Sequence, residues 1–144
     1  MAGRPPKEGL DYSDWDVALF DDPKIDRLID SMGCNGFTIF FYLCQRGYGT
    51  YGYYLPWRDQ DAATVARKVG GGVKSAEVTD TVAECLCNGL FDVDVYTKHK
   101  VLTSRAMQKR FVRVLSVRRV RNVIAEYWLL PPEKSGGAIC LPNN

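Results

Sequence analysis

The sequence is poor in the residues that build metal centres, disulfide frameworks and membrane spans. It has one histidine, His99, and its five cysteines form neither the C-x-x-C spacing of zinc and redox sites nor an even-numbered framework. We therefore expect no metal and no cofactor, and interpret the cysteines as reduced thiols of a cytoplasmic protein. The longest apolar stretch, Ile39 to Cys44, is far shorter than the roughly 20 residues of a transmembrane helix. The N-terminus lacks the apolar segment of a secretory signal, so neither export nor a membrane partner is expected.

Catalytic motifs are also missing. The run from Gly70 to Ser75 places Lys-Ser after three glycines, but Val73 stands where a phosphate-binding P-loop needs a glycine. The segment before it has a helical pattern, whereas a P-loop follows a strand. Asp92 and Asp94 are explained more simply as surface acids than as a catalytic pair. We therefore expect a protein that is not an enzyme.

Charge is unevenly distributed along the chain. Residues 1–97 hold nine Lys or Arg and fifteen Asp or Glu, whereas residues 98–144 hold ten Lys or Arg and two Glu. Between Lys98 and Arg121 there are nine bases and no acid. Such asymmetry suggests that one face of the protein meets a polyanion, often a nucleic acid.

The pattern of apolar residues predicts a single mainly helical α+β domain at residues 10–130, between a mobile arm at 1–9 and a tail at 131–144. Capping residues and helical spacing predict helices at 23–32, 35–46, 59–69 and 74–88, and a last helix that begins after Ser104. Alternation and β-rich composition predict strands at 48–57, 90–96 and 101–103, with a turn at 97–100.

This order of elements predicts a winged helix-turn-helix with an extra N-terminal helix and a basic C-terminal helix. The helices at 59–69 and 74–88 form the helix-turn-helix, and residues 90–103 form the wing. In such modules the second paired helix usually enters the major groove and the wing contacts the backbone or minor groove. The outward face of the helix at 74–88 is predicted to be acidic, which weakens a major-groove role and leaves a structural or protein-binding role open.

The basic residues of the predicted wing tip and last helix are the stronger candidates for DNA contact. Arg105, Lys109 and Arg113 recur every four residues and therefore share one face of a helix. A solvated helix face, or pairing with acids of the N-terminal part, remains the alternative explanation. The candidate DNA-binding residues are Lys74, Ser75, Thr79, Lys98, His99, Lys100, Arg105, Lys109, Arg110 and Arg113.

Several short motifs, in order along residues 4 to about 130, resemble one known family. They are Arg4-Pro5-Pro6-Lys7-Glu8-Gly9-Leu10-Asp11-Tyr12, Asp16-Val17, Phe20-Asp21-Asp22-Pro23-Lys24-Ile25, Gly36-Phe37, Gly52-Tyr53-Tyr54, Pro56-Trp57, Asn88-Gly89-Leu90-Phe91-Asp92, Val101-Leu102-Thr103-Ser104, Gln108-Lys109-Arg110-Phe111 and Arg118-Arg119. As a set they resemble the N-terminal domain of phage replisome organizers, a winged-helix domain found ahead of DnaD-like replication initiation domains.

That resemblance implies a winged-helix fold and a role in phage or prophage replication initiation, through binding DNA and recruiting replication proteins. Within these 144 residues we expect no second domain that would load a helicase. Two alternatives stay open. One is a protein-interaction adaptor of phage origin that uses the acidic helix and aromatic surface; the other is a small winged-helix transcriptional regulator, which would need to dimerise to read a two-fold site.

Overall fold

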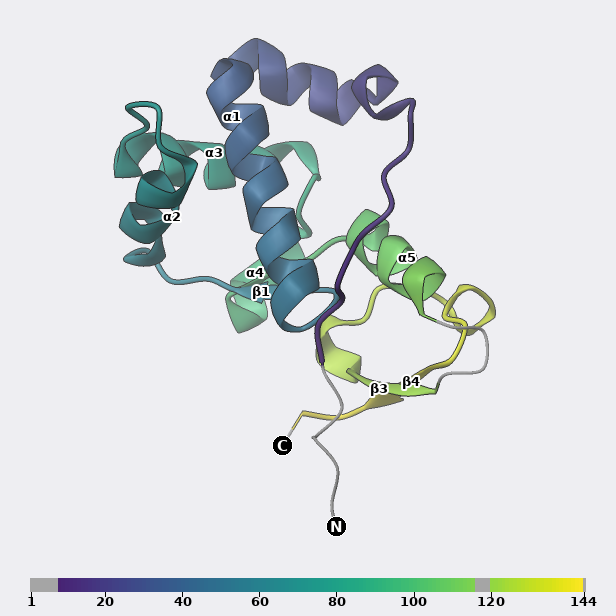
Figure 1. The fold of residues 1–144 in the computed structure, drawn as a ribbon. Helices are drawn as coiled ribbons and strands as arrows, with labels where there is room; N and C mark the ends of the chain where they lie inside the picture. Colours follow the sequence, from purple (N-terminus) through teal and green to yellow (C-terminus); the bar gives the residue numbers. More distant parts are fainter. Residues whose placement is uncertain (1–7, 116–119, 144) are drawn as a thin grey trace.

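The fold is α+β and mainly helical, in a computed structural model that describes residues 8–115 and 120–143 (Figure 1). The helices and strands of this part of the chain are α1 Pro23–Thr50, β1 Leu55–Pro56, α2 Asp61–Val69, α3 Ser75–Asn88, α4 Val93–His99, β2 Val101–Leu102, α5 Arg105–Val114, β3 Arg121–Ile124 and β4 Ala138–Leu141. Short 3-10 turns lie at Leu19–Asp21, Ala125–Tyr127 and Pro132–Lys134. None of the helices described combines the length and apolar character that crossing a bilayer requires.

The two helices predicted on either side of Gly33 are present and form α1, which bends sharply between them (Figure 1). Asp22 begins the helix, since its side chain accepts a hydrogen bond from the Lys24 amide at 2.9 Å and Pro23 occupies the first position. Gly33 has φ 69° and ψ −165°, a conformation that glycine adopts readily and other residues rarely do. The bend directs the longer C-terminal half of α1 into the centre of the molecule.

The predicted end of the second helix at residue 46, just before Gly47, is wrong, because the helix continues to Thr50. Gly47 is buried, and a Cβ there would lie 2.9 Å from the Met107 Cε and 3.3 Å from the Tyr54 carbonyl oxygen. The glycine therefore permits close packing inside the helix. The predicted strand at 48–57 shrinks to Leu55–Pro56 as a result.

The helices predicted at 59–69 and 74–88 are confirmed as α2 and α3, which are joined by the glycine turn 70–72. Both pack against α1, and together the three helices enclose the larger of two apolar clusters. Its fully buried members include Leu28, Leu43 and Val78. Leu102 and Met107, from much later in the chain, complete the same cluster.

The prediction that residues 90–103 form a wing of two paired strands is wrong. Residues 93–99 form α4, and β2 pairs antiparallel with β1, Leu55 opposite Leu102 and Pro56 opposite Val101. The cause is a helix cap, since the Asp92 carboxylate accepts a hydrogen bond from the Val95 amide at 2.9 Å. The alternating acids and valines that favoured a strand thus belong to a capped helical turn.

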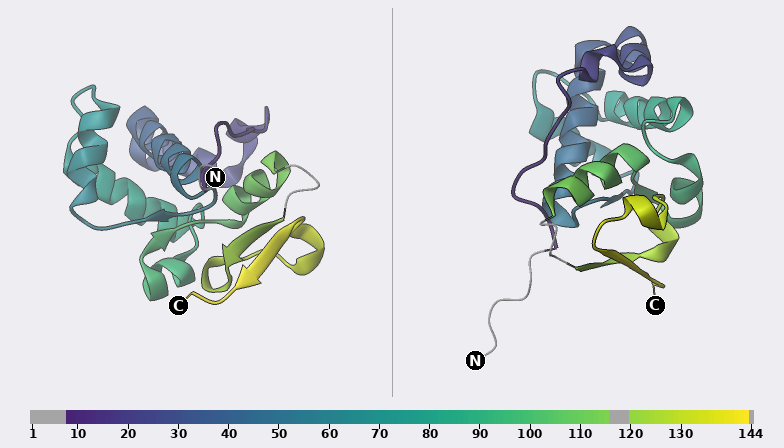
Figure 2. Two further views of the ribbon diagram at one scale, coloured as in Figure 1. Left: turned by 60° about the horizontal axis from the view of Figure 1, so that its bottom comes forward. Right: turned by 90° about the vertical axis from the view of Figure 1, so that its right-hand side faces the viewer.

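The C-terminal residues were predicted as a tail, but Ala138–Leu141 forms β4, which pairs in parallel with β3. The views in Figure 2 and Figure 1 place this pair beside α5. Phe111 of α5 packs there with Val123 and Tyr127 in the second apolar cluster. A 3-10 turn at Ala125–Tyr127 follows β3, and the backbone is extended again at Trp128.

The predicted arm is described only from Glu8 onward, and residues 1–7 lie outside the described residues. The Arg121 guanidinium donates a hydrogen bond to the Glu8 carbonyl, and the Leu10 amide donates to the Tyr48 carbonyl at 2.7 Å. The described end of the arm is therefore packed against α1 and β3.

Candidate nucleic-acid interface

Helix α5 holds the predicted basic face on a firmly anchored element. The Ser104 hydroxyl caps it by accepting a hydrogen bond from the Met107 amide at 3.1 Å, as the sequence predicts. Gln108 is fully buried, and its side-chain nitrogen donates to the Tyr127 carbonyl at 2.8 Å while its oxygen accepts from the Leu129 amide at 2.7 Å. These bonds fix α5 to the segment that follows it, so the exposed side of the helix has a defined direction.

The three bases spaced four residues apart on α5 are all exposed, as their common face requires. The side chains of Arg105 and Lys109 make no hydrogen bond or ion pair with any described residue. Arg113 differs, because its guanidinium contacts the Asp14 carboxylate at 2.9 Å and 3.3 Å. Those hydrogen bonds lower the pKa of Asp14, which is therefore ionised and offsets the Arg113 charge.

Arg110 points away from this face. It is buried, its guanidinium carbon lies 3.9 Å from the centre of the Trp15 ring, and it donates to the Tyr48 hydroxyl at 3.1 Å. Its Nε has no hydrogen-bond acceptor among the described residues. Arg110 is thus a packing residue in this structure, and its charge is not exposed to a phosphate.

The residues predicted as the wing tip form a corner between α4 and β2. Lys98, His99 and Lys100 are all exposed there. The His99 ring centre lies 5.3 Å from that of Tyr127, and the Lys100 ammonium lies 4.7 Å from the centre of the Tyr96 ring. The Lys100 carbonyl accepts a hydrogen bond from the Trp57 amide at 2.9 Å, which fixes this corner to the chain just after β1.

Lys74, Ser75 and Thr79 are exposed at the N-terminal end of α3. The acidic face predicted for this helix is weaker than its sequence indicates. Glu77 is half-buried and accepts a hydrogen bond from the Asn35 amide group at 3.0 Å, and Thr81 is fully buried. The exposed residues of α3, together with Lys74, the residue that precedes it, include one basic and one acidic residue: Lys74, Ser75, Ala76, Thr79, Asp80, Ala83 and Cys87.

The structure divides the predicted DNA-binding residues between two sides of the molecule. Helices α2 and α3 lie on one side of the C-terminal half of α1, and α5 lies on the other (Figures 1 and 2). Arg118 and Arg119, which extend the basic run, lie outside the described residues. No single described surface carries all the candidates.

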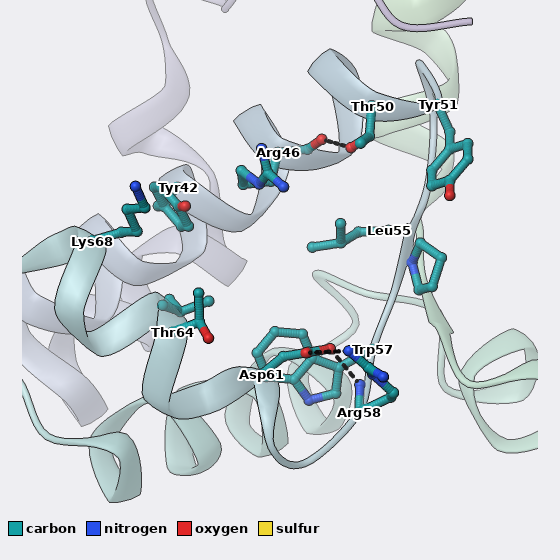
Figure 3. A pocket seen from close by; sticks show the side chains of 12 residues that line it. Tyr42, Arg46, Thr50, Tyr51, Leu55, Trp57, Arg58, Asp61, Thr64 and Lys68 are labelled. Atoms are coloured by element: carbon teal, nitrogen blue, oxygen red, sulfur yellow. Dashed lines mark hydrogen bonds and ion pairs between the residues drawn. The ribbon is translucent and has the colours of Figure 1, made fainter.

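A further basic site was not predicted from the sequence. A hollow of about 840 Å³ opens between the C-terminal half of α1, α2 and β1, and we call it the α1–α2 groove (Figure 3). Its lining includes three bases and three aromatic residues, namely Tyr42, Arg46, Tyr51, Trp57, Arg58 and Lys68. These residues are spread over 27 positions in four segments, so no local motif announces them. The only sequence signal is the aromatic run from Tyr48 to Trp57.

The cysteines described are all free, and the described residues contain no cluster of three potential metal ligands. Cys44 and Cys85 are buried. Burial raises the pKa of Cys44 to about 12 and raises that of Cys85 as well, so both thiols are protonated at neutral pH. Neither thiol is activated as a nucleophile.

Comparison with known proteins identifies the family. The Lin1244/Lin1753-like, N-terminal family matches residues 12–107. A relative from Listeria innocua serovar 6a, named uncharacterized phage-related protein Lin1244/Lin1753, is 30% identical over 127 residues. The alignment covers 88% of this chain and 41% of the relative, so the chain spans less than half of that protein's length. No solved structure matches. With two thirds of its residues inside the family match, the chain belongs to the Lin1244/Lin1753-like N-terminal family.

Proposed function

We propose that this chain is a non-enzymatic DNA-binding module of a phage-type protein. It acts in replication initiation by binding DNA and bringing replication proteins to it. The observation that carries the proposal is the presence of two exposed basic residues on α5, Arg105 and Lys109, whose side chains form no ion pair with a described residue. The motifs that resemble replisome organizers support the replication role, and the phage-related name of the Listeria relative supports the phage origin.

Phosphate neutralisation is the proposed mode of binding on α5. Helix α5 is anchored through its buried face. Its exposed basic residues can therefore contact the DNA backbone without a change in the position of the helix. Lys98 and Lys100 at the α4–β2 corner add further exposed cations a few residues before the start of α5. Contacts of this kind give salt-dependent affinity with little preference for sequence.

For the fold, we propose a variant of the winged helix in which a short helix replaces the first strand of the wing. The C-terminal half of α1, β1, α2, α3 and β2 follow the winged-helix order, and α4 occupies the position of the first wing strand. In this arrangement the α4–β2 corner takes the role of the wing tip. Lys74, Ser75 and Thr79 at the start of α3 are placed for additional contacts with bases or phosphates.

The test is fluorescence anisotropy of a labelled 20-base-pair duplex between about 50 and 200 mM salt, with wild-type protein and the Arg105→Ala/Lys109→Ala variant. Each neutralised phosphate contributes about 0.9 to the slope of log affinity against log salt, so the variant is expected to lose about 1.8. The matched control is Arg27→Ala/Lys134→Ala, which removes the same two charges from exposed positions elsewhere. Equal slopes for the two variants, or no wild-type binding at about 50 mM salt, would contradict the proposal.

A protein-interaction adaptor is the second candidate, and the segment before α1 favours it. Tyr12 and Phe20 are 69% and 63% exposed, and the side chain of Val17 is fully exposed. Exposed apolar residues grouped in one segment are typical of a surface that binds another protein. Absence of DNA binding at low salt would favour this function.

A further inference from the structure

The α1–α2 groove brings together two kinds of side chain that are separated in the sequence. Figure 3 shows Tyr42 and Lys68 at one end of the hollow and Tyr51 at the other, with Arg46 between them on α1. Leu55 lies against the open space from the side of β1. The groove therefore offers cations and aromatic rings along one path.

The charges of the groove are not balanced within it. Its one acid, Asp61, is held by Arg58, whose guanidinium lies 3.2 Å from the carboxylate. Arg46 and Lys68 are exposed, and their charged groups have no hydrogen bond or ion pair within the part of the chain that the structure describes. These two side chains are available to an anionic ligand.

The aromatic residues of the groove form a pre-arranged surface. The ring of Tyr51 stacks on that of Tyr54, with centres 4.7 Å apart and planes 14° apart, so Tyr51 does not need to be ordered by a ligand. Tyr42 and Tyr51 are half-buried, and Trp57 is buried beneath the hollow. Tyr51 also lines a neighbouring hollow beside β3, which continues the surface beyond the groove.

We propose that the α1–α2 groove binds a single-stranded nucleic-acid segment. Unpaired bases stack on Tyr51 and Tyr42, and the phosphates of the strand contact Arg46 and Lys68. This pairing of aromatic platforms with cations is how proteins hold single strands without reading their sequence. In a duplex the faces of the bases are already covered by their neighbours, so recessed rings select an unpaired strand.

This inference rests on the proposed nucleic-acid function and assigns it a second site. The groove lies on the α2 side of α1, whereas α5 lies on the other side (Figure 1). The two sites can therefore be removed separately. A protein that holds a duplex at one surface and a single strand at another is suited to a point where DNA is opened.

The test measures by fluorescence anisotropy how the intact chain binds three labelled probes. They are a ten-thymidine strand, an abasic strand of the same length, and a duplex. Arg46→Ala/Lys68→Ala is expected to weaken binding of the thymidine strand at least about tenfold, because phosphate contacts dominate affinity. Tyr51→Leu is expected to weaken it at least about fivefold and leave the abasic strand unchanged, since only bases stack. Tyr51→Phe keeps the ring and is expected to restore binding.

Matched controls separate this inference from the proposed function. Arg27→Ala/Lys134→Ala controls for net charge. Arg105→Ala/Lys109→Ala is expected to weaken binding of the duplex more than binding of the thymidine strand. Unchanged thymidine-strand binding in the groove variants overturns the inference even when the duplex binds to α5. If the wild-type protein binds none of the three probes, the proposed function is overturned as well. Displacement of the thymidine strand by a ten-glutamate peptide at equal concentration overturns the inference in favour of an acidic protein segment.

Discussion

At the scale of single residues, Lys109 and Arg110 are neighbours in the basic run but have different environments. Lys109 is exposed, whereas Arg110 is 8% exposed, lies over Trp15 and donates to Tyr48. A guanidinium stacks on an aromatic face while a hydrogen bond satisfies one of its donors, so arginine tolerates this position. The charge of Arg110 therefore contributes to the packing of the N-terminal segment.

Alanine substitutions at these two positions are expected to differ in their effect on stability. Arg110→Ala removes the contact with Trp15 and leaves a gap beneath it, so the free energy of unfolding should fall by about 1–3 kcal/mol. Lys109→Ala should leave it within about 0.5 kcal/mol of wild type, as is usual for exposed residues. Urea denaturation measures both, with tryptophan fluorescence as the signal. Equal stability of the two variants would show that Arg110 does not hold Trp15.

At the scale of elements, helix caps predicted structure better than alternation did. Ser104 marked the start of α5, and Asp22 with Pro23 marked the start of α1. Asp92 carries the same signal for α4, but the valines and acids after it also fit a strand, and in the structure the cap at Asp92 begins a helix.

The cap at Asp92 gives a direct test of what makes α4 helical. Asp92→Ala is expected to lower the free energy of unfolding by about 1 kcal/mol, the usual cost of losing an N-cap. Asp92→Asn keeps a side-chain acceptor and should recover most of this loss. Asp94→Ala removes an exposed acid of the same turn and should cost a few tenths of a kcal/mol. Chemical denaturation checks the series, and a cost for Asp94→Ala as large as that for Asp92→Ala would contradict the cap.

Local signals predicted the helices and the basic face of α5, but not the contacts between distant segments. The pairing of β3 with β4 depends on residues 121 and 138 meeting, and nothing in either short segment specifies its partner. The α1–α2 groove has the same origin, since Arg46 and Lys68 line one hollow only when α2 packs on α1. The burial of Arg110 likewise requires Trp15, which is 95 positions earlier.

At the scale of the whole molecule, part of the charge asymmetry is neutralised internally. The acidic segment before α1 lies against α5 at one point, where Asp14 pairs with Arg113, and both side chains are about half exposed. The contact reduces the basic face of α5 to Arg105 and Lys109. The N-terminal acids and the C-terminal bases are thus partly joined within one fold.

This ion pair predicts a small loss of stability in acid. Arg113 holds the pKa of Asp14 below its ordinary value of 3.8, so the pair stabilises the fold above that pH and its contribution disappears as pH falls through the lowered pKa. The unfolding free energies of wild type and Asp14→Asn should differ by less than about 1 kcal/mol at pH 6 and converge by about pH 2. Denaturation series at both pH values measure the difference, and a difference that grows in acid would contradict this assignment.

The pairing of Leu55 with Leu102 also determines the order in which the protein can be assembled on the ribosome. The larger apolar cluster needs Leu102 and Met107 as well as Ile25 and Leu28. Helices α1, α2 and α3 are therefore synthesised before the residues that complete their core. Until those residues emerge, the nascent chain exposes apolar surface of a kind that chaperones bind.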